Sequence, residues 1–318
     1  MKRDKKSGKK YIIILLLATV VLVSGCSQGS QSPSGLGNGL RILEFKSNQE
    51  GAKLRANEPL QFTARIQNQG TTRARNVRVN VVELLDKDKW SGIFEQNIGD
   101  LTGFNQEQSL AGPIRTITFT SRTPQYAVEQ IIKPKLSLKY DNVLRGSGTI
   151  TLVDTDTFIQ RRDSGQGLIS EFGTADAGPL DIRMEVPEVR TSTQGSTTDL
   201  LVPVKITITD KAGNPASAHV TQGLAQSQDF TYPVRTSITW PSRLSPDFTG
   251  ADPLCQNGVI NLNAGKSYDT TCILRVTNPP ERGAPAEKVS FQIELQYTYE
   301  LLQPLAQPIS VLKSTTGF

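Results

Sequence analysis

The stretch Leu201-Val-Pro-Val-Lys-Ile-Thr-Ile-Thr209 alternates apolar and polar side chains over its whole length. Its apolar members occupy every second position from Val202 to Ile208, so in an extended chain they share one face. The same period recurs in Leu60-Gln-Phe-Thr-Ala-Arg-Ile-Gln67. This pattern predicts half-buried β-strands, and after residue 26 we find no sustained helical period with caps.

Similar short segments, separated by clusters of Gly, Pro and Asn, continue through both halves of the chain. In the first half we expect strands at 41–46, 60–67, 77–85, 114–121, 135–140 and 148–152. In the second half we expect strands at 181–186, 200–209, 234–240, 259–262, 269–276, 289–299 and 308–312. Strands at this density without helices predict an all-β fold with two immunoglobulin-like β-sandwich domains in tandem.

The N-terminal residues have the pattern of an export signal. Met1–Lys10 carry six basic side chains against one acid, and the thirteen residues Tyr11–Val23 that follow are mostly apolar. A basic head, a short apolar run and small residues at its end define a secretory signal peptide. Spanning the bilayer as a helix takes roughly twenty residues. We therefore expect residues 1–25 to be a signal peptide; an uncleaved membrane anchor is the alternative.

The end of this segment, Val23-Ser-Gly-Cys26, resembles the lipobox of prokaryotic lipoproteins. The resemblance implies cleavage before Cys26 and a lipid on its sulfur, which would hold the protein on the extracytoplasmic face of the cell membrane. A plain signal peptide that ends near a cysteine is the alternative. Residues 26–39 are uncharged and rich in Ser and Gly, so we expect a flexible tether.

The signal also accounts for the basic charge. The whole chain has a formal net charge of +5, but without residues 1–25 it holds 29 Lys and Arg against 29 Asp and Glu. The exported part is then formally neutral, which removes the electrostatic argument for a nucleic-acid partner.

Lipidation of Cys26 would leave Cys255 and Cys272 as a pair. In an exported protein we expect them to form a disulfide, which stabilises a loop of this length by about 3 kcal/mol. A metal site is the alternative, but His219 is the only histidine and no further Cys pair completes a tetrahedral set. We therefore expect no metal and no cofactor.

Composition divides the exported part into three segments. We expect one sandwich over residues 40–155, a polar, Gly-rich linker over 156–177, and a second sandwich over 178–318. Asp154 and Asp156 could ligate calcium at the start of the linker, although this segment lacks the Gly and distal Glu of an EF-hand loop.

The first half contains a more specific resemblance. Asn68-Gln-Gly-Thr-Thr-Arg-Ala-Arg-Asn-Val-Arg-Val-Asn-Val81 resembles the pattern of CARDB-type domains, and Ile260–Val276 is similar to a later stretch of that family. These are immunoglobulin-like modules of bacterial and archaeal surface proteins associated with adhesion. The resemblance implies a fold and a cell-surface setting, and it carries over no catalytic residues.

The candidate binding residues are Arg73, Arg75 and Arg78, which cluster around one turn. They could form a binding surface, or they could be charges that protect a solvated strand edge. A catalytic serine elbow, a phosphate-binding loop and a dinucleotide fingerprint are all absent from the sequence.

These features favour a non-enzymatic, lipid-anchored surface protein whose domains bind an envelope protein or a glycan. A structural or assembly subunit of an envelope complex is the alternative, and an atypical hydrolase that uses linker carboxylates is a minor one.

Overall fold

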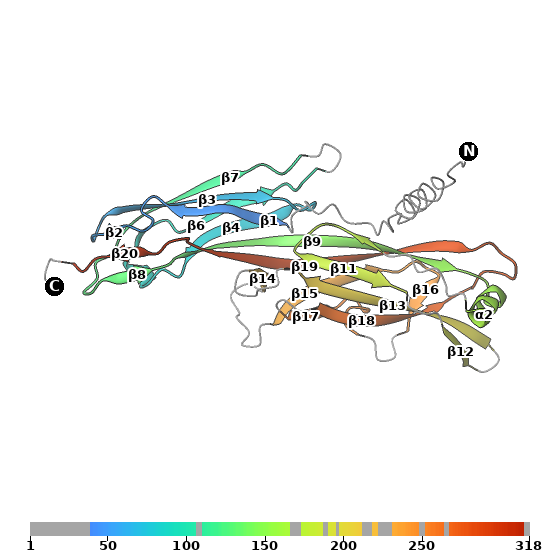
Figure 1. Ribbon diagram of the computed structural model, residues 1–318. Coiled ribbons are helices and arrows are strands. Elements are labelled where there is room, and N and C mark those ends of the chain that lie inside the picture. Colours follow the sequence, from blue (N-terminus) through green and yellow to red (C-terminus); the bar gives the residue numbers. More distant parts are fainter. Residues whose placement is uncertain are drawn as a thin grey trace, which may run out of the picture. The chain divides into compact units, whose positions relative to one another are not determined.

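The computed structural model describes the chain from Gly39 to Ser314 with eight internal gaps. The described ranges are 39–105, 110–165, 173–186, 190–194, 197–211, 218–221, 231–247, 252–263 and 267–314. They form several antiparallel sheets and very little helix, which confirms the all-β, sandwich-like fold (Figure 1). None of the described helices is long and apolar enough to cross a membrane.

The largest sheet has eight strands drawn from both halves of the chain. They are β4 (Ala74–Val82), β6 (Glu95–Leu101), β9 (Lys135–Leu152), β10 (Thr174–Ala175), β14 (Ala218–Thr221), β15 (Thr231–Thr239), β17 (Val259–Asn263) and β19 (Glu287–Pro304). The order is β17-β15-β19-β9-β4-β6, with β10 paired to β9 and β14 paired to β19.

Three smaller sheets accompany it. Four strands form the first, β1 (Leu40–Ser47), β3 (Pro59–Asn68), β7 (Arg115–Arg122) and β5 (Ser91–Gly92), in that order. Five form the second: β11 (Leu180–Glu185), β13 (Thr197–Asp210), β18 (Ser267–Val276) and β16 (Leu244–Pro246), with β12 (Arg190–Gln194) paired to β13. Three form the third, β2 (Lys53–Leu54), β20 (Ile309–Val311) and β8 (Gln130–Ile132).

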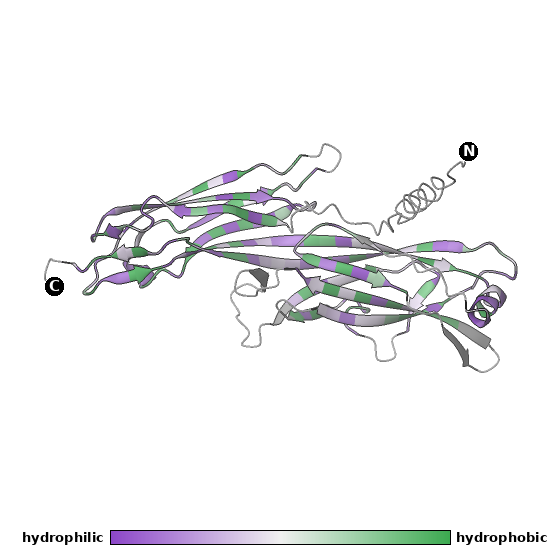
Figure 2. Ribbon diagram, viewed as in Figure 1, coloured by the Kyte–Doolittle hydropathy of each residue, from purple (hydrophilic) through white to green (hydrophobic). Residues whose placement is uncertain are grey.

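The predicted core faces are confirmed. Alternate residues of β3, β4 and β13 are fully buried, as the period-two pattern requires, and Figure 2 shows the same alternation of hydropathy along the strands. The fully buried members are Phe62, Ala64, Ile66, Val77, Val79, Val81, Val202, Val204, Ile206 and Ile208.

Strands β9 and β19 connect the two halves. Each is eighteen residues long, and they pair without a break from Lys135 opposite Pro304 to Leu152 opposite Glu287. Where we expected two strands at 135–140 and 148–152, β9 runs straight through. The two predicted sandwiches therefore share one sheet.

The reason β9 continues is that polar and small residues between the expected strands fit its inward face. Asn142 is buried and its amide is hydrogen-bonded inside the protein. Gly148 lies opposite Phe291, whose ring occupies the space that a side chain at 148 would need. Asn and Gly in this stretch therefore serve a strand and not the turn that their types suggested.

The expected linker is partly structured. Thr155–Asp163 form helix α2, whose first turn is capped by the Asp154 side chain. The capping bond, from Thr157 N–H to Asp154 Oδ1, measures 3.0 Å.

A single-turn 3₁₀ helix, η1, covers Lys87–Lys89. At the other end of the chain, β20 pairs with β2 and β8, so the last strand completes a sheet of the first half.

Candidate binding surface

The eight-stranded sheet has one polar face. Along β9 and β19 one set of alternate side chains is buried, and the other set is exposed or half-buried and almost wholly polar. Opposite residues in the register share this outer face, which gives cross-strand pairs such as Arg145 with Glu294 and Asp141 with Thr298. We call this outer surface of β4, β9, β19 and β15 the polar face.

Two of the three predicted arginines lie on this face. Arg75 is opposite Asp141 and Arg78 is opposite Lys139, although residues three apart on a regular strand would point to opposite sides. A β-bulge between them, with Asn76 at a φ of 51°, supplies the extra residue that aligns them. Arg73 precedes β4, and its Nε lies 3.7 Å from Asp100 Oδ2.

The polar face has two adjoining hollows. The first, of about 550 Å³, is lined by one arginine and two acids, together with hydroxyl and amide groups. We call it the acidic hollow; its polar side chains are those of Arg145, Asp176, Glu294, Gln292, Ser147, Ser237, Thr239 and Thr71.

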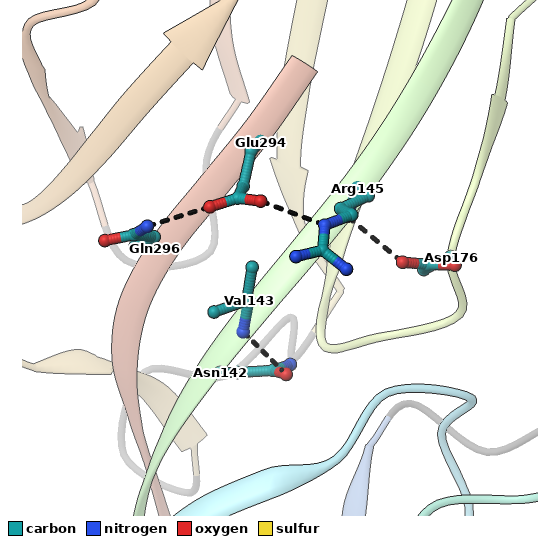
Figure 3. A network of polar contacts seen from close by, with 6 residues as sticks. All are labelled: Asn142, Val143, Arg145, Asp176, Glu294 and Gln296. Carbon is teal, nitrogen blue, oxygen red and sulfur yellow. Dashed lines mark hydrogen bonds and ion pairs between the residues drawn. The ribbon is translucent and has the colours of Figure 1, made fainter. Parts of the chain in front are cut away.

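Glu294 organises the acidic hollow (Figure 3). Its Oε1 accepts a hydrogen bond from Gln296 Nε2 at 2.8 Å, and its Oε2 accepts one from Arg145 Nε at 2.9 Å. These two bonds lower the pKa of Glu294 against the smaller opposing effect of burial. Asp176 lies on the other side of Arg145, whose backbone N–H donates to Asp176 Oδ2 at 3.2 Å. The acidic hollow therefore carries two carboxylates beside Arg145, one bonded to its guanidinium and the other to its backbone N–H.

The second hollow, of about 520 Å³, is lined by two arginines and one acid. Arg75 on β4 and Arg235 on β15 are both exposed, and no ion pair joins either to a described carboxylate. The acid, Asp141, already accepts hydrogen bonds from Asn76 Nδ2 at 2.8 Å and from Thr298 Oγ1 at 2.7 Å. We call this the arginine hollow; the other residues of its lining are Asn76, Asn142, Val143, Pro233, Val259, Gln296, Tyr297 and Thr298.

A buried polar cluster lies on the inner side of the same strands. Asn142 donates to the Tyr297 hydroxyl at 3.0 Å, and the Tyr299 hydroxyl donates to Asp210 Oδ1 at 3.0 Å. Burial raises the pKa of Tyr140, Tyr297 and Tyr299 well above the usual tyrosine range. Asp210 ends β13 of the five-stranded sheet, so the bond from Tyr299 links that sheet to β19, whereas the bond from Asn142 joins β9 to β19.

Cys255 and Cys272 form a disulfide, with their Cα atoms 5.6 Å apart. Cys272 lies on β18 of the five-stranded sheet, and Cys255 lies in the turn that leads into β17 of the eight-stranded sheet. The bond therefore links the two sheets of the second half. This agrees with the pairing expected from the sequence.

The other candidate residues are accounted for differently. Cys26 and most of the expected tether lie outside the described residues, as does the side chain of His219. Asp154 caps helix α2, and Asp156 pairs with Arg282 at 2.7 Å, so both acids proposed for calcium have protein partners. Within the described ranges, His, Cys, Asp and Glu form no group of three that could hold a metal ion.

No protein-family model matches this chain, and no curated protein matches it. The resemblances to the lipobox and to CARDB-type domains therefore stay predictions from the sequence.

Proposed function

We propose that this chain is a non-enzymatic lipoprotein on the outer side of the cell membrane that binds an envelope partner through its polar face. The observation that carries the proposal is the pair of adjoining hollows on that face. Most of their ionic and hydrogen-bonding side chains come from the four neighbouring strands β4, β9, β19 and β15, and Asp176 and Thr71 come from the segments beside them. Binding sites commonly combine a concave surface with a few convergent polar groups.

Two further features support the exported setting. Disulfides form and persist in oxidising compartments outside the cytoplasm, and Cys255 and Cys272 are joined in one. The N-terminal segment has the order of a lipoprotein signal, with the small residues Ser24 and Gly25 before Cys26.

The body is also suited to presenting a surface at a distance from a membrane. The unbroken pairing of β9 with β19 and the buried bond between Tyr299 and Asp210 connect the two halves through regular structure. A ligand-binding face gains affinity when it is pre-organised, because less freedom is lost on binding.

The same connection favours a second candidate, a structural subunit of an extracytoplasmic complex in which the two halves act as a spacer. Affinity purification of the full chain from detergent-solubilised membranes separates the two. Recovery of fixed partners in stoichiometric amounts favours the structural subunit, and recovery of the chain without them favours the binding protein.

The anchor is tested by fractionating cells that express the full chain with Cys26→Ala, with Ser27→Ala as the matched control. We expect the Cys26 variant to lose membrane retention and the Ser27 variant to keep it. Equal membrane retention of both variants would refute lipid anchoring.

A further inference from the structure

The arginine hollow presents two exposed guanidinium groups that no ion pair joins to a described carboxylate. In the adjoining acidic hollow the arginine is paired, because Arg145 Nε lies 2.9 Å from Glu294 Oε2. Arg75 and Arg235 are exposed, line the same hollow, and are joined to no described carboxylate. Asp141 is the one acid in the lining, so within the lining two arginines face one aspartate; the charge of Arg75 also helps to lower the pKa of Glu294 in the adjoining acidic hollow.

The two arginines stand on opposite sides of the hollow. Arg235 pairs with Gln296, and the next outward-facing rung holds Thr298, Asp141 and Arg75. Three strand spacings and one two-residue step place their Cα atoms roughly 16 Å apart. Both side chains reach the hollow from its edges, so a ligand between them meets a guanidinium at each end.

The chemistry of these walls favours a carboxylate. The guanidinium fork matches the two oxygens of a carboxylate or a phosphate and forms short, charge-assisted hydrogen bonds. A carboxylate carries one negative charge, which matches the lining of the arginine hollow, where two arginines face one aspartate. A phosphate carries two negative charges, and the carboxylates of Asp176 and Glu294 in the adjoining acidic hollow would repel it more strongly than they repel a carboxylate.

The position within the sheet favours a sugar chain over a peptide. An extended peptide that binds a sheet usually adds to an open edge, where its main chain can pair. Here the hollow lies over β9 and β19, which have paired strands on both sides, so the face offers side chains only. Those side chains include amides and hydroxyls, Gln292, Gln296, Ser237, Thr239 and Thr298, which suit sugar hydroxyl groups.

We infer that the arginine hollow binds the carboxylate of an acidic, uronic-acid-type oligosaccharide, and that the acidic hollow binds hydroxyl groups of the same chain. This inference rests on the proposed function and names its ligand class. Because the exported part is formally neutral overall, recognition is local and involves one carboxylate, without long-range attraction of a polyanion.

The test is calorimetric titration of the full chain, purified from membranes in detergent, with short oligogalacturonate and alginate oligomers. The methyl ester of oligogalacturonate is the uncharged match, and hexaglutamate is the peptide match. Arg75→Gln and Arg235→Gln are compared with Arg115→Gln, an exposed arginine on β7 of the four-stranded sheet.

We expect an acidic oligomer to bind, and we expect Arg75→Gln and Arg235→Gln each to weaken binding at least tenfold. Arg115→Gln should bind like the parent protein, and all three variants should be equally stable to heat. Failure of both acidic oligomers to bind, or equal binding of the ester, would overturn the inference. Equal binding of hexaglutamate would overturn the choice of a sugar. If these outcomes occur while membrane retention still depends on Cys26, the ligand class fails and lipid anchoring stands.

Discussion

The Tyr299 hydroxyl on β19 donates a buried hydrogen bond to Asp210 at the end of β13. Tyr299 is 1% exposed and Asp210 is 3% exposed, and the hydroxyl lies 3.0 Å from Asp210 Oδ1. Tyr299→Phe removes the hydroxyl while it keeps the ring that packs on Tyr140 and Tyr297, at centroid distances of 6.0 and 6.4 Å. The substitution therefore isolates one hydrogen bond between β19 and the end of β13.

The expected loss follows from the burial and the charge of the acceptor. Hydrogen bonds to charged groups contribute about 1.5–3 kcal/mol, and water cannot replace a bond that is sealed from solvent. We expect Tyr299→Phe to lower the free energy of unfolding by about 2 kcal/mol, which is roughly a 30-fold change in the unfolding constant. In an Asp210→Asn background the acceptor is neutral, so the loss should fall toward about 1 kcal/mol.

Urea denaturation followed by tryptophan fluorescence measures this loss. Tyr268→Phe is the matched control, because the Tyr268 hydroxyl donates to Asp252 at 2.6 Å but its ring is only partly buried. Water can take the place of that hydroxyl, so we expect a loss below about 1 kcal/mol. If Tyr299→Phe lowered the free energy of unfolding no more than Tyr268→Phe does, a solvent-excluded hydrogen bond between the two sheets would be refuted.

Removing the disulfide by Cys255→Ala with Cys272→Ala should lower the free energy of unfolding by about 3 kcal/mol. A reductant should then destabilise the parent protein and leave the double variant unchanged; equal sensitivity of both proteins to reductant would contradict this. Gly148→Ala should cost about 1–3 kcal/mol, measured by thermal unfolding, because the added Cβ would lie 2.4 Å from Phe291 Cζ; an unchanged midpoint would exclude the close packing. Stability should also fall as the pH rises above about 10, because unfolded tyrosine then ionises whereas burial raises the pKa of Tyr297 in the folded state. Urea midpoints at pH 8 and pH 11 measure this fall, and it should be smaller in Tyr297→Phe.

The sequence was sufficient to predict the strands that have one apolar and one polar face. Leu201–Thr209 is one example, and the residues expected to face inward there are buried. It was insufficient where local residue types pointed to a turn. Asn142 and Gly148 interrupt the apolar pattern, and only the partners across the sheet, Tyr297 and Phe291, show why a strand accepts them there. Those partners are more than 140 positions away in the chain.

The polar face illustrates the same limit. Arg75 and Arg78 were candidates because they are close in sequence, but their common orientation depends on the bulge at Asn76. The sequence did not connect Arg235 with them. Arg235 and Arg75 line one hollow because β15 pairs with β19, β19 with β9 and β9 with β4, and these strands are far apart in sequence. Spacing within one segment therefore identified part of the arginine hollow, and the sheet register was needed for the rest.

Photocrosslinking on intact cells tests most directly whether the polar face is the binding surface. A benzophenone side chain replaces Gln292, which lines the acidic hollow, or Thr118, which is exposed on β7 of the four-stranded sheet. We expect adducts with an envelope component from position 292 and few or none from position 118. We also expect Arg75→Gln with Arg235→Gln to reduce the adducts from position 292. Equal crosslinking from both positions, or adducts from position 118 alone, would contradict the claim that this face binds the partner.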